Sequence, residues 1–107
     1  MPLTLKHDVD AIGLTTGMLL AIIVVEGAYK DAGHVCTITS LSDGKHSPSS
    51  RHYVGCAADF RTMDIPKEKL PPLRETIANR LGPRYDVVLE PDHLHVEWDP
   101  KKQIGVA

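Results

Sequence analysis

Two short polar segments hold the residue types that metal chemistry requires. Residues 50–59 read Ser-Arg-His-Tyr-Val-Gly-Cys-Ala-Ala-Asp, and residues 90–97 read Glu-Pro-Asp-His-Leu-His-Val-Glu. Together they contain three of the six histidines and four of the fourteen carboxylates of the chain. Histidine and carboxylate side chains are the protein ligands of open zinc sites, in which water takes the fourth position. The two segments therefore predict a catalytic zinc centre.

The spacing within the first segment favours one pair of ligands. His52 lies seven residues before Asp59, with Gly55 between them. A loop that bends at the glycine can return both side chains to one point. Asp59 and Arg61 alternate with apolar residues, so both should point away from the core.

The second segment continues into the clearest predicted strand of the chain, His93–Trp98. Alternation turns Leu94, Val96 and Trp98 toward the core, and it turns His93, His95 and Glu97 toward the opposite face. Two strands that each offer polar side chains on one face can converge on a metal. Glu97 is expected to orient a ligating imidazole.

The remaining sequence predicts the scaffold for these segments. At 107 residues the chain is long enough for one domain, and the first thirteen residues are expected to be an irregular surface segment. Helical spacing and β-branched runs then predict, in order, helix Leu14–Lys30, strand Val35–Leu41, strand Ala57–Met63, helix Leu70–Leu81, and strands Tyr85–Leu89 and His93–Trp98. This order indicates an α+β domain, a small and mostly antiparallel sheet with helices packed on one side.

The first helix is expected to be largely buried, because its apolar residues leave little polar face: Met18, Leu19, Ile22, Ile23, Val25 and Tyr29. Gly33 is a plausible end of this helix. Pro71 suits the first turn of the second helix, and Gly82 suits its end.

Composition excludes several classes of function. The formal net charge of −2 argues against a nucleic-acid binder. The apolar stretch 17–25 is too short to span a bilayer, which argues against membrane insertion, and the acidic Asp8 and Asp10 before it argue against a signal peptide. We therefore expect synthesis in the cytoplasm. No CxxC pair exists, so Cys36 and Cys56 are expected to be small buried residues rather than part of a four-cysteine zinc site or a disulfide.

The pattern Ser50-x-His52-x-x-Gly55-x-Ala57-x-Asp59, followed by Asp92-His93-x-His95, resembles the M15 family of zinc peptidases. This family contains D-alanyl-D-alanine carboxypeptidases and L-alanyl-D-glutamate endopeptidases, and it shares its fold with the Hedgehog signalling domain. The resemblance covers roughly residues 14–99. The compact chain is similar to the small phage and prophage members.

The resemblance implies a zinc ligand set and a base. His52 and Asp59 would be the first two ligands, and His95 would be the third. The catalytic carboxylate of the family lies three residues before the last ligand, which here is Asp92. Asp92 would accept a proton from water and pass it to the leaving amine, while zinc polarises the scissile carbonyl.

The resemblance also implies roles around the metal. His93 would stabilise the developing oxyanion or position the base. Ser50 matches a serine near the substrate, and Lys45 or Arg51 would engage a substrate carboxylate.

One alternative register stays open for the base. Asp92 and His95 would point to opposite faces if both lay in a regular strand, so Asp92 can face the metal only if it belongs to a turn at Pro91. A rival register uses Glu90 as the base and His93 as the ligand, which are also three residues apart.

The leading hypothesis is a zinc metallopeptidase that hydrolyses an amide bond in peptidoglycan stem peptides, at the bacterial cell wall or as part of a virion. One alternative is a phage structural or morphogenesis protein that retains the fold as a binding module. Another is a structural zinc site with His93 or Cys56 as a fourth ligand. The bond that is cut, the host and the oligomeric state stay open.

Overall fold

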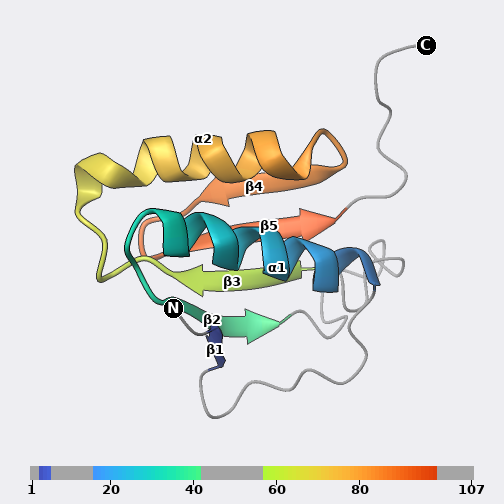
Figure 1. Ribbon diagram of the computed structural model, residues 1–107, viewed down its shortest axis with the longest axis horizontal. Coiled ribbons are helices and arrows are strands. Elements are labelled where there is room, and N and C mark those ends of the chain that lie inside the picture. Colours follow the sequence, from blue (N-terminus) through green and yellow to red (C-terminus); the bar gives the residue numbers. More distant parts are fainter. Residues whose placement is uncertain (1–2, 6–15, 42–56, 99–107) are drawn as a thin grey trace.

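The computed structural model describes residues 3–5, 16–41 and 57–98 of the chain. Secondary structure follows the order β1 (Leu3–Leu5), α1 (Thr16–Asp31), β2 (Cys36–Leu41), β3 (Ala57–Arg61), a 3₁₀ turn η2 (Lys67–Lys69), α2 (Leu70–Leu81), β4 (Tyr85–Leu89) and β5 (His93–Trp98). Figure 1 shows α1 lying over the central strands β3 and β5, approximately along them, and α2 running beside β4.

Within the described residues, five strands form one open sheet in the order β1-β2-β3-β5-β4. All neighbouring strands are antiparallel except β1 and β2, which are parallel. The expected α+β class and mostly antiparallel sheet are therefore confirmed. Strands β3 and β5, which carry the polar residues of interest, lie side by side in the interior of the sheet.

Most predicted elements are confirmed at or near their predicted bounds. Helix α2 and strands β4 and β5 have the predicted residues. Helix α1 ends one residue later than expected, at Asp31, and Gly33 follows with a φ of 86°. Strand β3 ends at Arg61 rather than Met63, because the Ile65 amide donates to the Thr62 carbonyl (3.0 Å) and closes a turn.

The prediction for the first thirteen residues was wrong at residues 3–5, which form β1. The Thr4 hydroxyl lies 2.7 Å from the Thr37 hydroxyl and also donates to the Cys36 carbonyl at 3.3 Å. A three-residue strand is too short to show periodicity in sequence. Its pairing with β2 adds a parallel strand at the edge of the sheet.

The prediction that α1 is largely buried was wrong for part of its apolar surface. Leu19, Leu20 and Ile23 are exposed, and Ile23 retains 65% of its accessible surface. The buried residues follow a single helical stripe: Gly17, Met18, Ala21, Ile22, Val25, Ala28 and Tyr29. The described helices pack on one face of the sheet, so α1 covers the sheet with one side only.

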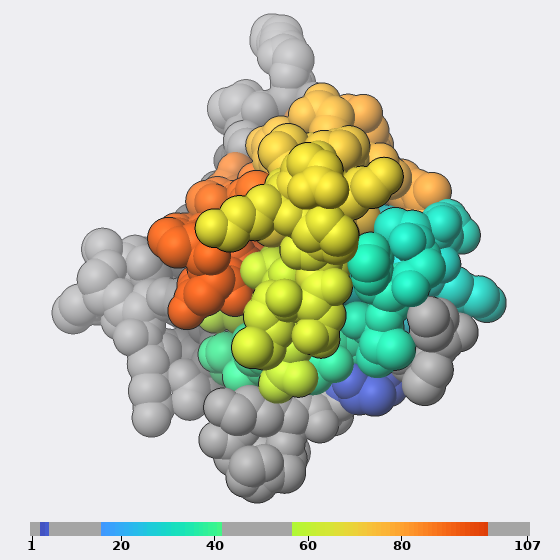
Figure 2. Space-filling view, turned by 90° about the vertical axis from the view of Figure 1, so that its left-hand side faces the viewer, coloured from blue at the N-terminus to red at the C-terminus, as the bar shows by residue number. Residues whose placement is uncertain are grey.

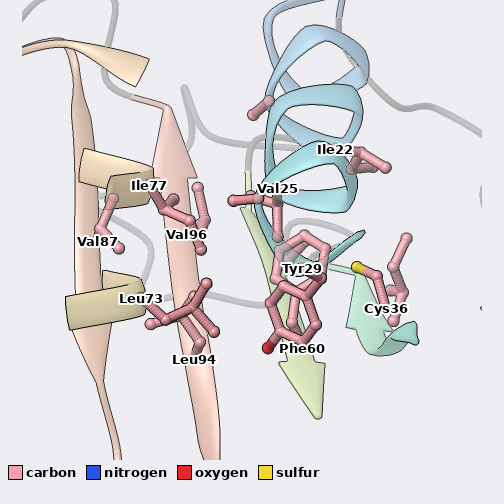
Figure 3. Close-up of a cluster of buried hydrophobic side chains, with 14 of the residues drawn as sticks. Ile22, Val25, Tyr29, Cys36, Phe60, Leu73, Ile77, Val87, Leu94 and Val96 are labelled. Carbon is pink, nitrogen blue, oxygen red and sulfur yellow. The ribbon is translucent and has the colours of Figure 1, made fainter. Parts of the chain in front are cut away.

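The core lies between the helices and the sheet (Figure 3). Alternate strand residues such as Phe60 and Leu94 face the helices, and the Phe60 ring packs 6.4 Å from the Tyr29 ring, centroid to centroid. Cys36 is buried here, as expected. Burial first, and the charge of Glu26 second, raise the pKa of the Cys36 thiol to about 12, so this thiol stays protonated at neutral pH.

The segment between β3 and α2 closes one end of this core. Figure 2 shows it, in yellow-green to yellow, between the β4–β5 end of the sheet and the end of α1. Ile65 and Leu73 contribute buried side chains. An ion pair between Arg80 and Asp31 (2.9 Å) joins α2 to α1. Neither α1 nor α2, the two α-helices of the described residues, has the length and hydropathy of a transmembrane span.

The start of α1 packs directly on the end of β5. A Cβ atom added to Gly17 would lie 2.4 Å from Cδ2 of the Trp98 ring, a distance that requires the ring to move. The Tyr85 hydroxyl donates to the Gly17 carbonyl at 2.9 Å, and Tyr85 pairs with Trp98 across the sheet. Glycine at position 17 therefore sets the closest approach of α1 to the strand that carries His93 and His95.

We expect Gly17→Ala to lower the free energy of unfolding by about 1–2 kcal/mol, because overpacking against Trp98 outweighs the gain in helix propensity. Gly27→Ala in the same helix is the matched control. The nearest atom to its added Cβ would be 3.9 Å away, so this change should stabilise the protein by roughly 0.5–1 kcal/mol. Urea denaturation of both variants measures the difference, and equal effects would contradict the packing argument.

Candidate metal centre

Strand pairing brings the described end of the first polar segment, residues 57–59, beside the second segment. In the β3–β5 register, Asp59 pairs with His95 and Arg61 pairs with His93. Their neighbours Phe60 and Leu94 are buried on the helix side, so alternation turns these four polar residues to the other face. The predicted orientation of both strands is confirmed.

The Asp59 carboxylate is the point on which two imidazoles converge. His95 Nδ1 lies 2.8 Å from Asp59 Oδ1, and His93 Nε2 lies 3.6 Å from the same oxygen. Two ligands of a tetrahedral zinc ion with bonds of about 2.0–2.2 Å are roughly 3.3–3.6 Å apart. An increase of about 0.5–0.8 Å would therefore bring Asp59 and His95 to the spacing of two zinc ligands.

The second ring nitrogen of His95 has its own carboxylate partner. His95 Nε2 lies 3.1 Å from Glu97 Oε1, on the same strand. A carboxylate on the far nitrogen fixes the orientation of a ligating imidazole and increases its basicity. Glu97 therefore contacts the imidazole that is expected to be a ligand, while its expected role in orienting a bound ligand stays a prediction.

The two carboxylates change the acidity of His95. The hydrogen bond to Asp59 is the largest cause that raises its pKa, the bond to Glu97 adds to it, and partial burial opposes both; the result is a pKa of about 9. Without a metal, the ring is therefore a protonated bridge between Asp59 and Glu97 at neutral pH. Zinc would take the place of the proton on the nitrogen that faces Asp59.

Asp92 lies in the turn before β5 rather than in the strand, which is the condition that its predicted role required. The Glu90 amide donates to the His93 carbonyl (2.8 Å) and closes this turn. The Asp92 side chain is 87% exposed, and its Oδ1 lies 2.6 Å from His93 Nδ1. This contact leaves His93 Nε2 on the side of Asp59.

A hollow of about 300 Å³ lies on this face, lined by Thr39, Asp59, Arg61, Met63, Asp92 and His93. A wider hollow of about 680 Å³ lies toward β4 and α2, and its lining includes His95 and Glu97. His95 therefore lines the wider hollow, and its cross-strand partner Asp59 lines the smaller one. Asp92 lines the smaller hollow and Glu90 lines neither, which favours Asp92 over Glu90 as the group that meets a substrate there.

The structure brings together Asp59, His93, His95 and Asp92 of the predicted site. His52, Ser50, Arg51, Lys45 and Cys56 lie outside the described residues. Among residues 3–5, 16–41 and 57–98, no three His, Cys, Asp or Glu side chains form a group able to hold a metal ion. The predicted ligand set takes one of its three members, His52, from outside these ranges.

Sequence reasoning placed Arg61 on the polar face without giving it a function. The cross-strand pairing of Arg61 with His93 and its place in the smaller hollow add it to the candidate site. Thr39, on β2, enters the hollow in the same way. Alternation along β3 was the available signal for Arg61, but only the strand order shows which residues face it.

The raised pKa of His95 gives the metal-free protein a defined pH dependence. The folded state holds the proton more tightly than the unfolded state, so this stabilisation is complete below about pH 6.5 and is lost as the pH rises toward 9. We expect the free energy of unfolding in EDTA to fall across this window, by at most about 1.4 kcal/mol per pH unit. Urea titrations of wild type and His95→Gln at several pH values measure it, and parallel curves would contradict the assignment.

No protein-family model, curated protein or solved structure matches this chain.

Proposed function

We propose that this protein is a zinc peptidase that hydrolyses an amide bond in peptidoglycan stem peptides. The observation that carries the proposal is the contact between Asp59 Oδ1 and His95 Nδ1, 2.8 Å apart although the residues are 36 positions apart in sequence. These are two of the three ligands implied by the resemblance to M15 zinc peptidases. The same resemblance supplies His52 as the third ligand.

The donor set suits zinc. Imidazole nitrogen and carboxylate oxygen are its usual ligands beside thiolate, and three protein ligands leave a position for water. Asp59 and His95 are each about a quarter exposed, which leaves access from solvent while shielding part of the charge. When bound, zinc lowers the pKa of a coordinated water and polarises a carbonyl group.

The side chains beside the proposed metal position would transfer the proton and stabilise the developing charge. Asp92, in the turn, accepts a proton from the attacking water; the water oxygen bonds to the carbonyl carbon, the carbon–nitrogen bond breaks, and the proton passes to the leaving amine. His93 contacts Asp92 through Nδ1, and its Nε2 faces Asp59. As an imidazolium it would donate from both ring nitrogens, and the Nε2 proton would then stabilise negative charge on the carbonyl oxygen.

The proposed site of action is the bacterial cell wall, with the protein made in the cytoplasm and released by lysis or carried on a virion. This part of the proposal is supported by the resemblance of the histidine and aspartate pattern to the M15 zinc peptidases. Strands β3 and β5 would supply two of the metal ligands and the turn before β5 would supply the base, for carboxypeptidase and endopeptidase activity alike.

Digestion of purified peptidoglycan by the zinc-loaded protein, followed by mass spectrometry of the muropeptides, tests the proposal. Loss of the terminal D-Ala from pentapeptides would identify a carboxypeptidase, and cleavage after L-Ala would identify an endopeptidase. The expected companion result is one zinc ion per chain, measured by elemental analysis. A folded, zinc-loaded protein that cuts no stem peptide would overturn the proposal and favour the binding-module alternative.

A further inference from the structure

Arg61 is a cationic side chain at the edge of the candidate centre to which the sequence pattern gives no role. It lies two residues after Asp59 on the same face of β3, so the two side chains leave the strand roughly 7 Å apart. It faces His93 across the β3–β5 pair and lines the hollow of about 300 Å³ that Asp59, Asp92 and His93 also line. Arg61 therefore shares a hollow with the proposed base, Asp92, and one proposed ligand, Asp59.

The backbone of Arg61 is fixed independently of its side chain. The Tyr29 hydroxyl donates to the Arg61 carbonyl at 2.8 Å, from the core side of the sheet. No ion pair joins the Arg61 guanidinium to another residue of the described ranges, whereas Arg74 and Arg80 each have an acidic partner there. A guanidinium that forms no ion pair with the carboxylates of the described residues is suited to bind one from a ligand.

The two candidate scissile bonds share one chemical feature. In a D-Ala-D-Ala terminus, the carbon that bears the leaving nitrogen also bears the terminal carboxylate. In the L-Ala-D-Glu bond, D-Glu is linked onward through its side chain, so the same carbon bears a free α-carboxylate. Both substrates therefore present a carboxylate next to the amine that leaves.

We propose that Arg61 binds this carboxylate, so that the smaller hollow receives the leaving residue; the inference rests on the proposed peptidase function. Arginine forms two parallel hydrogen bonds with a carboxylate, which fixes the orientation of the leaving residue as well as its charge. The hollow volume of about 300 Å³ is at the lower end for ligand sites and suits one small residue. This assigns to Arg61 the role that the family resemblance offered to Lys45 or Arg51.

The placement gives the two sides of the scissile bond different surroundings. The leaving residue enters the hollow of Arg61 and Asp92, where the proton is delivered to the amine. The acyl side then extends past His95 toward the wider hollow beside β4. Selection for a carboxylate on the leaving residue follows from this orientation.

The test compares two substrates that differ in one group. Zinc-loaded wild type, Arg61→Gln and Arg61→Lys are assayed on a stem peptide with the free carboxylate and on the same peptide with that carboxylate converted to an amide. We expect wild type to prefer the acid by about 10–100-fold in kcat/KM, in line with hydrogen bonds to charged groups. In Arg61→Gln, kcat/KM should fall for the peptide acid and stay unchanged for the amide, so that the preference disappears. Arg61→Lys should retain part of the preference.

Lys67→Gln, which removes a positive charge from the exposed η2 turn, is the control and should keep the wild-type preference. Zinc content and melting temperature establish that each variant is folded and loaded. An equal loss on both substrates in Arg61→Gln, or loss of the preference in Lys45→Gln or Arg51→Gln instead, would overturn the role of Arg61 and leave the peptidase function standing. If wild type cut neither peptide, the proposed function would fail first.

Discussion

Asp59→Asn is expected to abolish stoichiometric zinc binding and to lower the rate of stem-peptide hydrolysis by at least about 10³-fold, which corresponds to about 4 kcal/mol of transition-state stabilisation. The carboxylate is the proposed metal ligand, and it is also the group on which His93 and His95 converge. An amide has the same shape but no charge and a much poorer oxygen donor. Elemental analysis and muropeptide release measure the two losses.

The matched control for this variant is Asp64→Asn. Asp64 is an exposed carboxylate in the turn after β3, outside the lining of either hollow beside the centre. Its neutralisation should leave zinc content and rate unchanged. A fully zinc-loaded Asp59→Asn protein with wild-type activity would remove Asp59 from the ligand set and with it the main support for the proposed function.

Asp92→Asn is expected to retain zinc but to lower kcat by about 10²–10⁴-fold, the usual contribution of a general acid–base group. The side chain is not part of the proposed ligand set, so metal content should not change. In wild type, Asp92 Oδ1 lies 2.6 Å from His93 Nδ1. The asparagine oxygen can accept the same hydrogen bond from His93 Nδ1, which keeps the imidazole oriented. Single-turnover kinetics of the zinc-loaded variant measure the loss.

Glu90→Gln distinguishes the rival register from the preferred one. Glu90 is also three residues before a histidine, but it does not line the hollow that holds Asp92 and His93. Its substitution should change kcat by less than about tenfold, because the backbone N–H of residue 90, which donates to the His93 carbonyl and closes the turn, is retained. A larger loss in Glu90→Gln than in Asp92→Asn would assign the base to Glu90 and the ligand to His93.

The helices and strands were predicted best where apolar residues repeat regularly and where residues typical of an end of the element follow. Helix α2 has apolar residues at helical spacing, an early proline and a terminal glycine, and its bounds were predicted correctly. Strand β5 alternates without interruption, so both of its faces were predicted correctly. Strand β1 was missed because its three residues are held by pairing with β2, a contact distant in sequence. In α1, apolar residues lie around the helix, so the sequence pattern does not indicate which side packs against the sheet.

The sequence was sufficient to predict which face of its strand each site residue occupies, but not which of these side chains contact one another. Alternation placed Asp59 and His95 on one surface, but their 2.8 Å contact depends on β3 and β5 being neighbours in register. Arg61 entered the site for the same reason, through its pairing with His93. Asp92 depended on a turn at Pro91, which the sequence allowed and the hairpin geometry supplies. Long-range pairing is the information that a local pattern lacks.

The position of β3 and β5 within the sheet has a consequence for the lifetime of the centre. Each is flanked by a strand on both sides, so neither can separate from the sheet by fraying at an edge. Interior strands of a small domain open mainly through global unfolding, whereas edges and termini open locally at little cost. The distance between Asp59 and His95 should therefore persist for as long as the domain is folded. A metal held by both would be released through escape of the ion or loss of the entire fold, and it would in turn slow that loss.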